Sequence, residues 1–173
     1  MRAWTHADGD LARMLDLYSR PEVYQWLGAA PRPLETLDQA RAAVDRWAQP
    51  RRGPFGIWAV ERRDTGVVAG TVLLVPLPAA EALDAGAADA EEPVEVGWHF
   101  HPDSWGRGYA TEAARAVLEY GFDHGLAEVY AVVRPTNVRS LAVCGRLGMT
   151  ALGPTTRWYG VELEAFRIGR PVD

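Results

Sequence analysis

The chain has 173 residues with 23 acidic and 18 basic side chains, every basic one an arginine, and its formal net charge is −5. This balance argues against nucleic-acid binding, which needs a clustered basic face. The sequence has no run of about 18 apolar residues, which a membrane span would need, and no signal-like apolar stretch at its start. A lone cysteine cannot form an internal disulfide. We therefore expect one cytoplasmic domain, residues 1–173, with neither a nucleic-acid nor a membrane partner.

Helical patterns dominate the first third of the chain. Apolar residues recur at helical spacing over residues 10–18, and Pro21 restarts the chain before a second, short helix. Thr36 is followed three residues later by Gln39, the spacing of a capping box, which predicts a helix from there to about Trp47.

Strand patterns follow in the middle of the chain. Residues 55–61 and 67–75 are predicted as strands, joined by a hairpin turn at 64–66. The stretch 76–93 is rich in Ala, Asp and Glu and has little to bury, so it is predicted as a loop or insertion. Residues 94–100 are the next strand candidate.

The last third alternates helices and strands. The patterns predict helices at 111–124 and 138–147, and strands at 128–133, 151–152 and 161–167. This order predicts a single α+β domain with a mixed, mostly antiparallel central sheet flanked by helices. The two strands on either side of the first of these helices should be parallel, because a crossover joins them.

The strongest functional signal lies where a strand ends, a glycine-rich loop follows and a helix begins at once, in residues 100–113. A helix start leaves backbone N–H groups unpaired and carries partial positive charge, and phosphate oxygens satisfy both. Gly106 and Gly108 would let a bulky anion approach the main chain. The segment therefore predicts a phosphate site.

A Gly-x-Gly loop also occurs as a plain turn, in a P-loop and in a dinucleotide-binding fingerprint. A lone Gly-x-Gly more often marks only a turn. A P-loop needs a lysine, which the chain lacks, and a dinucleotide fingerprint needs a small Gly or Ala where Thr111 stands.

Residues 105–113, Trp-Gly-Arg-Gly-Tyr-Ala-Thr-Glu-Ala, resemble the acetyl-CoA signature of the GNAT superfamily of N-acetyltransferases, and most of all its RimJ/RimL-type ribosomal-protein branch. In the general signature, Gln/Arg-x-x-Gly-x-Gly/Ala, Trp105 replaces the first residue while Gly108 and Ala110 match the last two. Residues 95–102 and 137–149 also resemble family elements, so the likeness covers almost the whole chain. It implies one GNAT domain with a splayed parallel strand pair around the cofactor site.

The resemblance also implies acetyl-CoA as cosubstrate, no metal, and roles for particular residues. Main-chain groups of Trp98, His99 and Phe100 would pair with the pantetheine arm. The pyrophosphate would be held by the amides of the loop, with Thr111 close by: Gly106, Arg107, Gly108, Tyr109 and Ala110. The side chain of Asn137 would bond the pantetheine; on its own it is equally a helix N-cap.

Amide formation from a thioester needs a neutral amine, donors for the developing oxyanion and a proton for the thiolate. Glu95 is the first candidate base, the alternative being a solvated strand carboxylate. His99 shares its face in a regular strand and is either a second base or a packed histidine. His101 is expected to be exposed at the strand end.

The proton donor is less obvious from the sequence. Many family members carry a Tyr seven residues after the Asn, where this chain has Cys144, and some carry a Glu five residues before it, where this chain has Val132. Ser140 is the remaining polar candidate, or else a helix-start hydroxyl. Cys144 is expected to be a small buried apolar residue, and the thiolate could also take the proton of the amine.

We expect acetyl transfer to a primary amine, either a peptide N-terminal α-amine or a small-molecule amine. The alternative is a non-catalytic acyl-CoA-binding module, and a homodimer is left open. A different nucleotide-binding protein fits the extended likeness less well. Four aromatic residues are candidates for lining an acceptor pocket: Trp26, Trp47, Trp158 and Tyr159.

Overall fold

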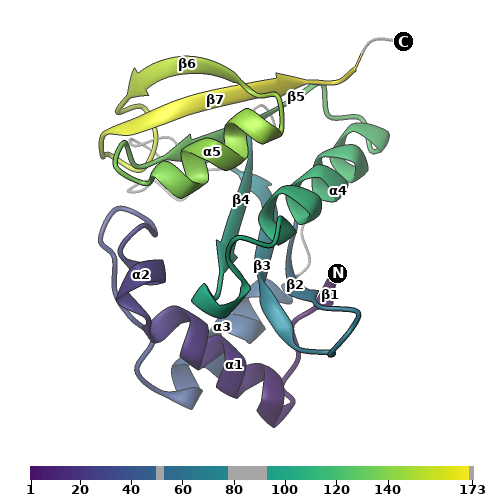
Figure 1. The fold of residues 1–173 in the computed structure, drawn as a ribbon, viewed down its shortest axis with the longest axis vertical. Coiled ribbons are helices and arrows are strands. Elements are labelled where there is room, and N and C mark those ends of the chain that lie inside the picture. The colour runs from purple at the N-terminus through teal and green to yellow at the C-terminus, as the bar shows by residue number, and fades with distance from the viewer. Residues whose placement is uncertain (50–52, 78–92, 172–173) are drawn as a thin grey trace.

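The computed structural model describes residues 1–49, 53–77 and 93–171 (Figure 1). The predicted loop at 76–93 lies almost wholly outside the described residues. The helices are α1 (Asp8–Ser19), α2 (Pro21–Tyr24), α3 (Leu37–Trp47), the 3-10 turn η2 (Pro102–Ser104), α4 (Tyr109–Asp123) and α5 (Val138–Arg146). The strands are β1 (Arg2–Ala3), β2 (Gly56–Glu61), β3 (Val68–Pro76), β4 (Val94–Phe100), β5 (Glu128–Val133), β6 (Thr150–Thr155) and β7 (Leu163–Gly169).

The seven strands form one sheet in the order β1-β2-β3-β4-β5-β7-β6. Every neighbouring pair is antiparallel except β4 and β5, which are parallel and joined through α4. The predicted α+β class, mixed sheet and parallel pair are therefore confirmed. The parallel pair registers at one position only, Glu95 opposite Tyr130, so the two strands separate beyond it.

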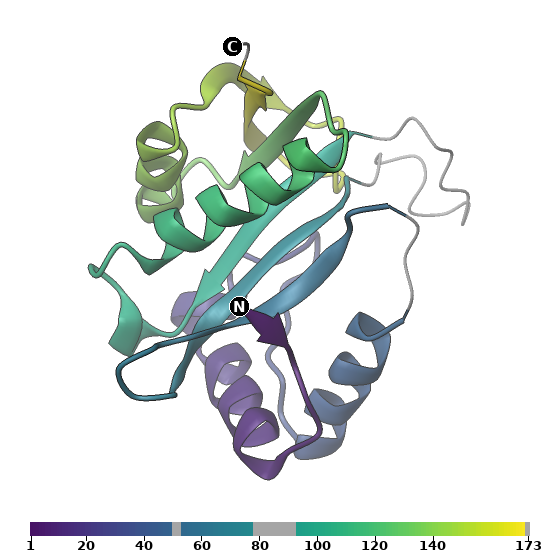
Figure 2. The ribbon, with the colours of Figure 1, turned by 90° about the vertical axis from the view of Figure 1, so that its right-hand side faces the viewer.

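Helices cover both faces of the sheet (Figure 2). Helices α4 and α5 lie on one face, and α1 and α3 on the other. The face under α4 and α5 holds the larger core, which includes Val96, Val117 and Val129. The other core joins α1 and α3 to the sheet through Met14 and Val44. The sheet is thus fixed from both sides, and it opens where β4 and β5 part.

Local signals account for the helix starts. Thr36 and Gln39 form the predicted capping box on α3, since the Thr36 hydroxyl accepts from the Gln39 amide at 3.2 Å. Helix α4 starts at Tyr109, two residues before the predicted position, because Gly108 adopts a left-handed conformation with φ of 79° and ends the loop there.

The last two strands differ from their predicted bounds. Strand β6 extends to Thr155, past Gly153 and Pro154, whereas only residues 151–152 were expected. It is the edge strand and has a register shift between Ala151 and Gly153, the setting in which a sheet tolerates proline.

The start of the chain is held to α1 by a buried carboxylate. Asp10, which is 7% exposed, accepts bonds from two nitrogens of Arg2 at 2.7 and 2.8 Å and from the hydroxyl of Thr5 at 2.8 Å. Burial alone would raise the pKa of Asp10, but the bonds from Arg2 and Thr5 outweigh it and lower that pKa below its ordinary value. The carboxylate therefore stabilises the fold above pH 4, and this stability is lost as the pH falls below that range.

Asp10→Asn should lower the free energy of unfolding at pH 7 by roughly 1–3 kcal/mol, less than for a fully buried pair because Arg2 is partly exposed. The difference from the wild type should begin to shrink below about pH 4, where the unfolded chain takes up a proton at Asp10, and should vanish only below the lowered pKa of the native carboxyl. Urea titrations at pH 7 and pH 3.5 measure both. Asp8→Asn, which removes the other acidic charge in the first turn of α1, is the matched control and should cost less.

Candidate functional site

The glycine loop ends in a row of unused backbone donors. Gly106 and Gly108 both have positive φ, 74° and 79°, and a Cβ at either would meet nothing within 4 Å. The first bond of α4 runs from the Glu112 amide to the Gly108 carbonyl. Within the described part of the chain, none of the backbone N–H groups of residues 106–111 donates to a protein acceptor. These donors at a helix start form an anion cradle.

A charged cluster beneath the loop fixes its direction. His101 is 5% exposed, so the expectation that it is exposed is wrong. Its Nε2 lies 3.0 Å from an oxygen of Asp16 on α1, and its Nδ1 accepts from the Asp103 amide at 3.2 Å. Arg13 donates to both oxygens of Asp103 at 2.9 and 3.0 Å. The chain turns through η2 immediately after β4, which brings this side chain under α1 rather than into solvent.

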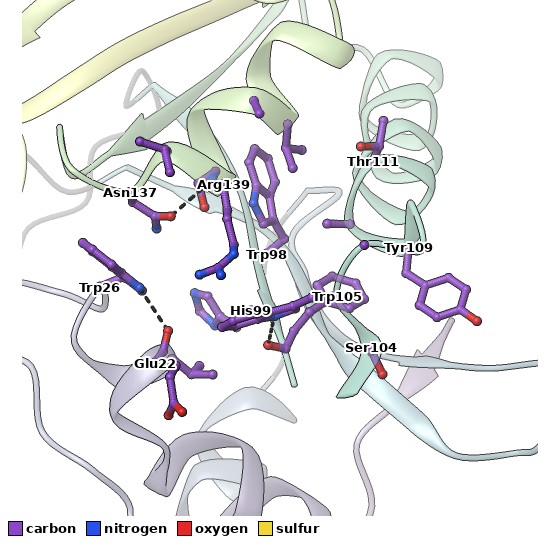
Figure 3. A pocket seen from close by; sticks show the side chains of 18 of the residues that line it. Glu22, Trp26, Trp98, His99, Ser104, Trp105, Tyr109, Thr111, Asn137 and Arg139 are labelled. Atoms are coloured by element: carbon purple, nitrogen blue, oxygen red, sulfur yellow. Dashed lines mark hydrogen bonds between the residues drawn. The ribbon is translucent and has the colours of Figure 1, made fainter. Parts of the chain in front are cut away.

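A cavity of about 640 Å³ opens in front of the cradle (Figure 3). The predicted cofactor residues line it, except for Arg107, which is exposed: Trp98, His99, Phe100, Gly106, Gly108, Tyr109, Ala110, Thr111 and Asn137. Figure 3 shows Trp26, which follows α2, and Asn137, at the start of α5, on one side of the cavity, with Tyr109 and Thr111 on the other. The cavity thus runs from the cradle to the gap between β4 and β5.

Two arginines on α5 add positive charge to this cavity, a role that was not predicted from the sequence. The Arg139 guanidinium lies 4.4 Å from the centre of the Trp105 ring. Arg146 donates from Nε to the hydroxyl of Thr111 at 3.2 Å, beside the start of α4. Their seven-residue spacing, two helical turns, was the signal that could have found them.

A second cavity of about 180 Å³ adjoins the first. Glu95 and Tyr159 line it, and so do aliphatic side chains of β3, β5 and β7 and the turn before β7: Leu73, Val75, Val132, Val161 and Leu163. The two cavities share some of their lining residues: Trp26, Leu27, Trp98, His99, Asn137 and Ser140. A molecule in one cavity can therefore meet a molecule in the other at this boundary.

Glu95 is a buried carboxylate, not the solvated one of the alternative interpretation. It is 9% exposed, and one of its oxygens, Oε2, accepts a bond of 2.6 Å from the Tyr159 hydroxyl. Burial raises the pKa of Glu95 to about 7, and the bond from Tyr159 opposes that rise. A carboxylate with such a pKa can hold or release a proton near neutral pH.

His99 lies on the same face of β4 as Glu95. The register with β3 runs without a shift from Gly70 opposite Phe100 to Pro76 opposite Val94, so β4 is regular, as expected. Burial lowers the pKa of His99 to about 4, so the ring is neutral at pH 7. The Tyr18 hydroxyl donates to Thr71 at 2.8 Å and lies 3.1 Å from His99 Nδ1. In the tautomer that carries its proton on Nδ1, this nitrogen donates to Tyr18 and Nε2 keeps its lone pair.

Asn137 and Ser140, at the start of α5, line the cavities, whereas Cys144 of the same helix lies in the core. Asn137 caps the helix, because its Oδ1 accepts from the Ser140 amide at 3.2 Å, and its NH₂ group bonds to none of the residues that the structure describes. Ser140 lines both cavities. Cys144 is fully buried and its pKa is raised to about 12 by burial, which confirms its expected place among the apolar residues.

Two of the four proposed pocket aromatics lie elsewhere. Trp47 packs on Trp4 and Tyr18 in the core between α1 and α3, at ring separations of 6.4 and 5.8 Å. Trp158 is buried against Tyr130 at 5.6 Å. Neither lines the described cavities, because each faces a hydrophobic core that its local sequence does not reveal.

The sequence and the fold both resemble those of known proteins. Residues 1–150 match the family model described as an acetyltransferase (GNAT) domain. The chain belongs to the GNAT acetyltransferase family. It is 28% identical over 168 residues to YoaA of Bacillus subtilis strain 168, an uncharacterised N-acetyltransferase, with 96% of this chain and 85% of YoaA covered.

Two solved structures share the GNAT fold. One is an acetyltransferase of the GNAT family from Bacillus anthracis, with a TM-score of 0.75, 21% identity, and coverage of 97% of this chain and 92% of that chain. The other is a ribosomal-protein-alanine N-acetyltransferase from Brucella melitensis, with a TM-score of 0.70, 18% identity and coverage of 98% of both chains. These similarities concern the fold.

The GNAT protein is an acetyltransferase, and acetyl-CoA is the donor that this family uses. The donor set fits such a ligand, because CoA carries a diphosphate and the cavity offers free N–H groups and two arginines. Among the described residues, no helix is long and apolar enough to cross a bilayer, and no cluster of His, Cys, Asp or Glu is placed to hold a metal ion.

Gly108→Ala should weaken CoA binding at least tenfold by calorimetry, because a methyl group would crowd the approach to the cradle. The left-handed φ of 79° should also cost roughly 1–2 kcal/mol of stability. Gly66→Ala is the matched control: its φ is 70°, its surroundings are equally open, and it lies in the β2–β3 turn. It should lose similar stability and keep its CoA affinity. Wild-type affinity in Gly108→Ala would refute the cradle.

Proposed function

We propose that this GNAT enzyme transfers the acetyl group of acetyl-CoA directly to a primary amine bound in the smaller cavity, with no covalent enzyme intermediate. The observation that carries the proposal is the buried Glu95 carboxylate at the side of a cavity that adjoins the cradle. A base is needed there because amines are protonated at neutral pH, and only the neutral amine attacks a thioester.

In this proposal the cofactor residues keep the roles expected from the sequence. The diphosphate lies against the amides of residues 106–110, with Thr111, Arg146 and Arg139 beside it. Main-chain groups of residues 98–100, on the side of β4 that has lost its neighbour, hold the pantetheine together with the Asn137 amide. The thioester supplies an activated acetyl group, and Ser140 at the boundary of the cavities is the candidate donor to the leaving thiolate.

Glu95 acts as the base, directly or through water. The pKa of Glu95 limits which amine it can deprotonate. Each unit by which the pKa of the ammonium exceeds that of Glu95 adds about 1.4 kcal/mol to the free energy of proton transfer. An α-ammonium, with a pKa near 8, is about one unit above Glu95, whereas a lysine-like ammonium is about three units above. His99, which is neutral and lies on the same face of β4, is the second candidate base: in the Nδ1–H tautomer its Nε2 can accept a proton.

The acceptor is accordingly a peptide N-terminal α-amine or a small-molecule amine. The RimJ/RimL-like form of residues 105–113 and the pKa argument support the α-amine. The limited volume of about 180 Å³ supports a small amine. We also infer that residues 1–173 form one domain. The cytoplasmic location and the homodimer remain predictions.

The alternative is a module that binds acyl-CoA without turnover. The missing tyrosine at Cys144 supports it, while the buried carboxylate beside the gap argues for catalysis. A panel of peptides and small amines, assayed for free CoA release and acetylated product, separates the two. Binding of CoA with no release on any acceptor would favour the module.

Glu95→Gln should lower kcat by about 10²–10⁴ and leave the KM for acetyl-CoA within about twofold, because general-base catalysis typically contributes that much. The wild-type kcat/KM should rise with pH through about 7, as the carboxylate loses its proton, and the variant should lack that limb. Glu128→Gln, which alters another strand carboxylate bonded to a tyrosine at 2.6 Å, is the control and should change neither quantity. An unaltered profile in Glu95→Gln would remove Glu95 from the base role.

A further inference from the structure

The turn between β6 and β7 holds a tyrosine in a backbone conformation that tyrosine rarely adopts. Tyr159 has φ of 57°, and no other described residue except glycine has a positive φ. Gly160, which follows it, has φ of 63°. A bulky residue in the left-handed region carries a conformational cost, and such residues gather at functional sites.

The neighbouring residue fixes this turn. Trp158 is 4% exposed, and its ring packs on Tyr130 of β5 at 5.6 Å and against Leu77 and Ala165. The guanidinium of Arg157 lies over the Trp158 ring, 5.3 Å from its centre. With Trp158 anchored in a core, the left-handed turn directs the next side chain to the smaller cavity, where the Tyr159 hydroxyl lies 2.6 Å from Glu95 Oε2.

We propose that Tyr159 is a positioning residue for the catalytic base: its hydroxyl holds one oxygen of Glu95 and sets the pH above which Glu95 can accept a proton. The inference rests on the proposed function of Glu95. A bond of 2.6 Å has the length of a charge-assisted bond from a hydroxyl to a carboxylate. Glu95 Oε1 accepts no bond from the described residues, so it is the oxygen available to the acceptor.

The other described groups around Glu95 are aliphatic or are bonded to other partners. Strand β3 presents aliphatic Leu73 and Val75 to the same cavity. On β5, the hydroxyl of Tyr130, the register partner of Glu95, is bonded to Glu128. Arg134 donates to the Gly28 carbonyl at 2.8 Å.

His99, on the same face of β4, is neutral, and its Nδ1 lies 3.1 Å from the Tyr18 hydroxyl. Among the described groups, Tyr159 is thus the one that bonds to the Glu95 carboxylate and opposes the effect of its burial.

The proton balance assigns the two residues different tasks. The carboxylate of Glu95 takes one proton from the acceptor ammonium and becomes a neutral carboxyl group, and the amine is left neutral. Tyr159 keeps its own proton throughout, because burial first, and then the charge of Glu95 and the bond to it, raise the pKa of Tyr159. It therefore acts through Glu95 rather than as the acid for the thiolate.

Tyr159→Phe tests the inference, because it keeps the ring and removes only the hydroxyl. Without that donor the charged form of Glu95 loses its bond, so the acidic limb of kcat/KM should move up by about one pH unit. Activity should fall about tenfold at pH 6 and less than threefold at pH 9. Combined with Glu95→Gln, the change should add no further loss. Tyr130→Phe, which removes the hydroxyl of the other 2.6 Å tyrosine–glutamate bond of the sheet, should leave the limb in place.

A measurement without turnover separates this inference from the proposed function. In protein labelled with ¹³C at glutamate carboxyls, the Glu95 resonance is the one lost in Glu95→Gln, and its titration midpoint should rise in Tyr159→Phe only. Thermal melting checks that each variant is folded. An unmoved midpoint, or an equal shift in Tyr130→Phe, would overturn the role of Tyr159. A raised midpoint in Tyr159→Phe, together with a wild type that acetylates no amine, would refute the proposed function alone.

Discussion

Strands β4 and β5 run parallel and register only where Glu95 faces Tyr130, and the site depends on their separation beyond that point. A strand in the middle of a sheet normally has both rows of its polar groups paired. Beyond Glu95, β4 keeps its antiparallel bonds to β3, but no strand of the described residues pairs with its other side. On that side the Phe100 carbonyl accepts a bond of 2.7 Å from the Trp105 indole, and the remaining main-chain groups there are left to a ligand in the middle of a sheet, where both faces are already packed.

The same separation explains the charge states of the side chains beside it. Glu95 and His99 lie on a face of β4 that is enclosed by α1, the residues after α2 and the β6–β7 turn. Poor solvation disfavours the charged form of each, so the pKa of the carboxyl rises and that of the imidazole falls. One geometric feature thus yields a carboxyl group whose pKa lies near neutral pH and a neutral imidazole beside it.

The phosphate end of the site, near the glycine loop, is positively charged, in contrast to the acidic chain as a whole. The chain as a whole is acidic, with a net charge of −5, yet the cradle joins free N–H groups to Arg139 and Arg146 on α5. Arg13 pairs with the carboxylates of Asp16 and Asp103 beneath the loop, at 3.5 and 2.9 Å. The result is a local site for an anion that net charge does not reveal, held in one direction by α1 and α4.

The sequence by itself determined the features that arise from neighbouring residues. The capping box at Thr36, the left-handed glycines of the loop, the helix that follows them and the regular alternation of β4 all follow from spacing and local backbone chemistry. These were enough to predict the fold class and the position of the cradle.

Tertiary structure alone decided which side chains meet. Tyr159 reaches Glu95 from 64 residues away, Arg146 reaches Thr111 from 35 residues away, and His101 is buried because α1 lies over the turn that follows β4. Local spacing carries no information about such distant partners, and burial, which sets the pKa values, exists only after the helices pack on the sheet.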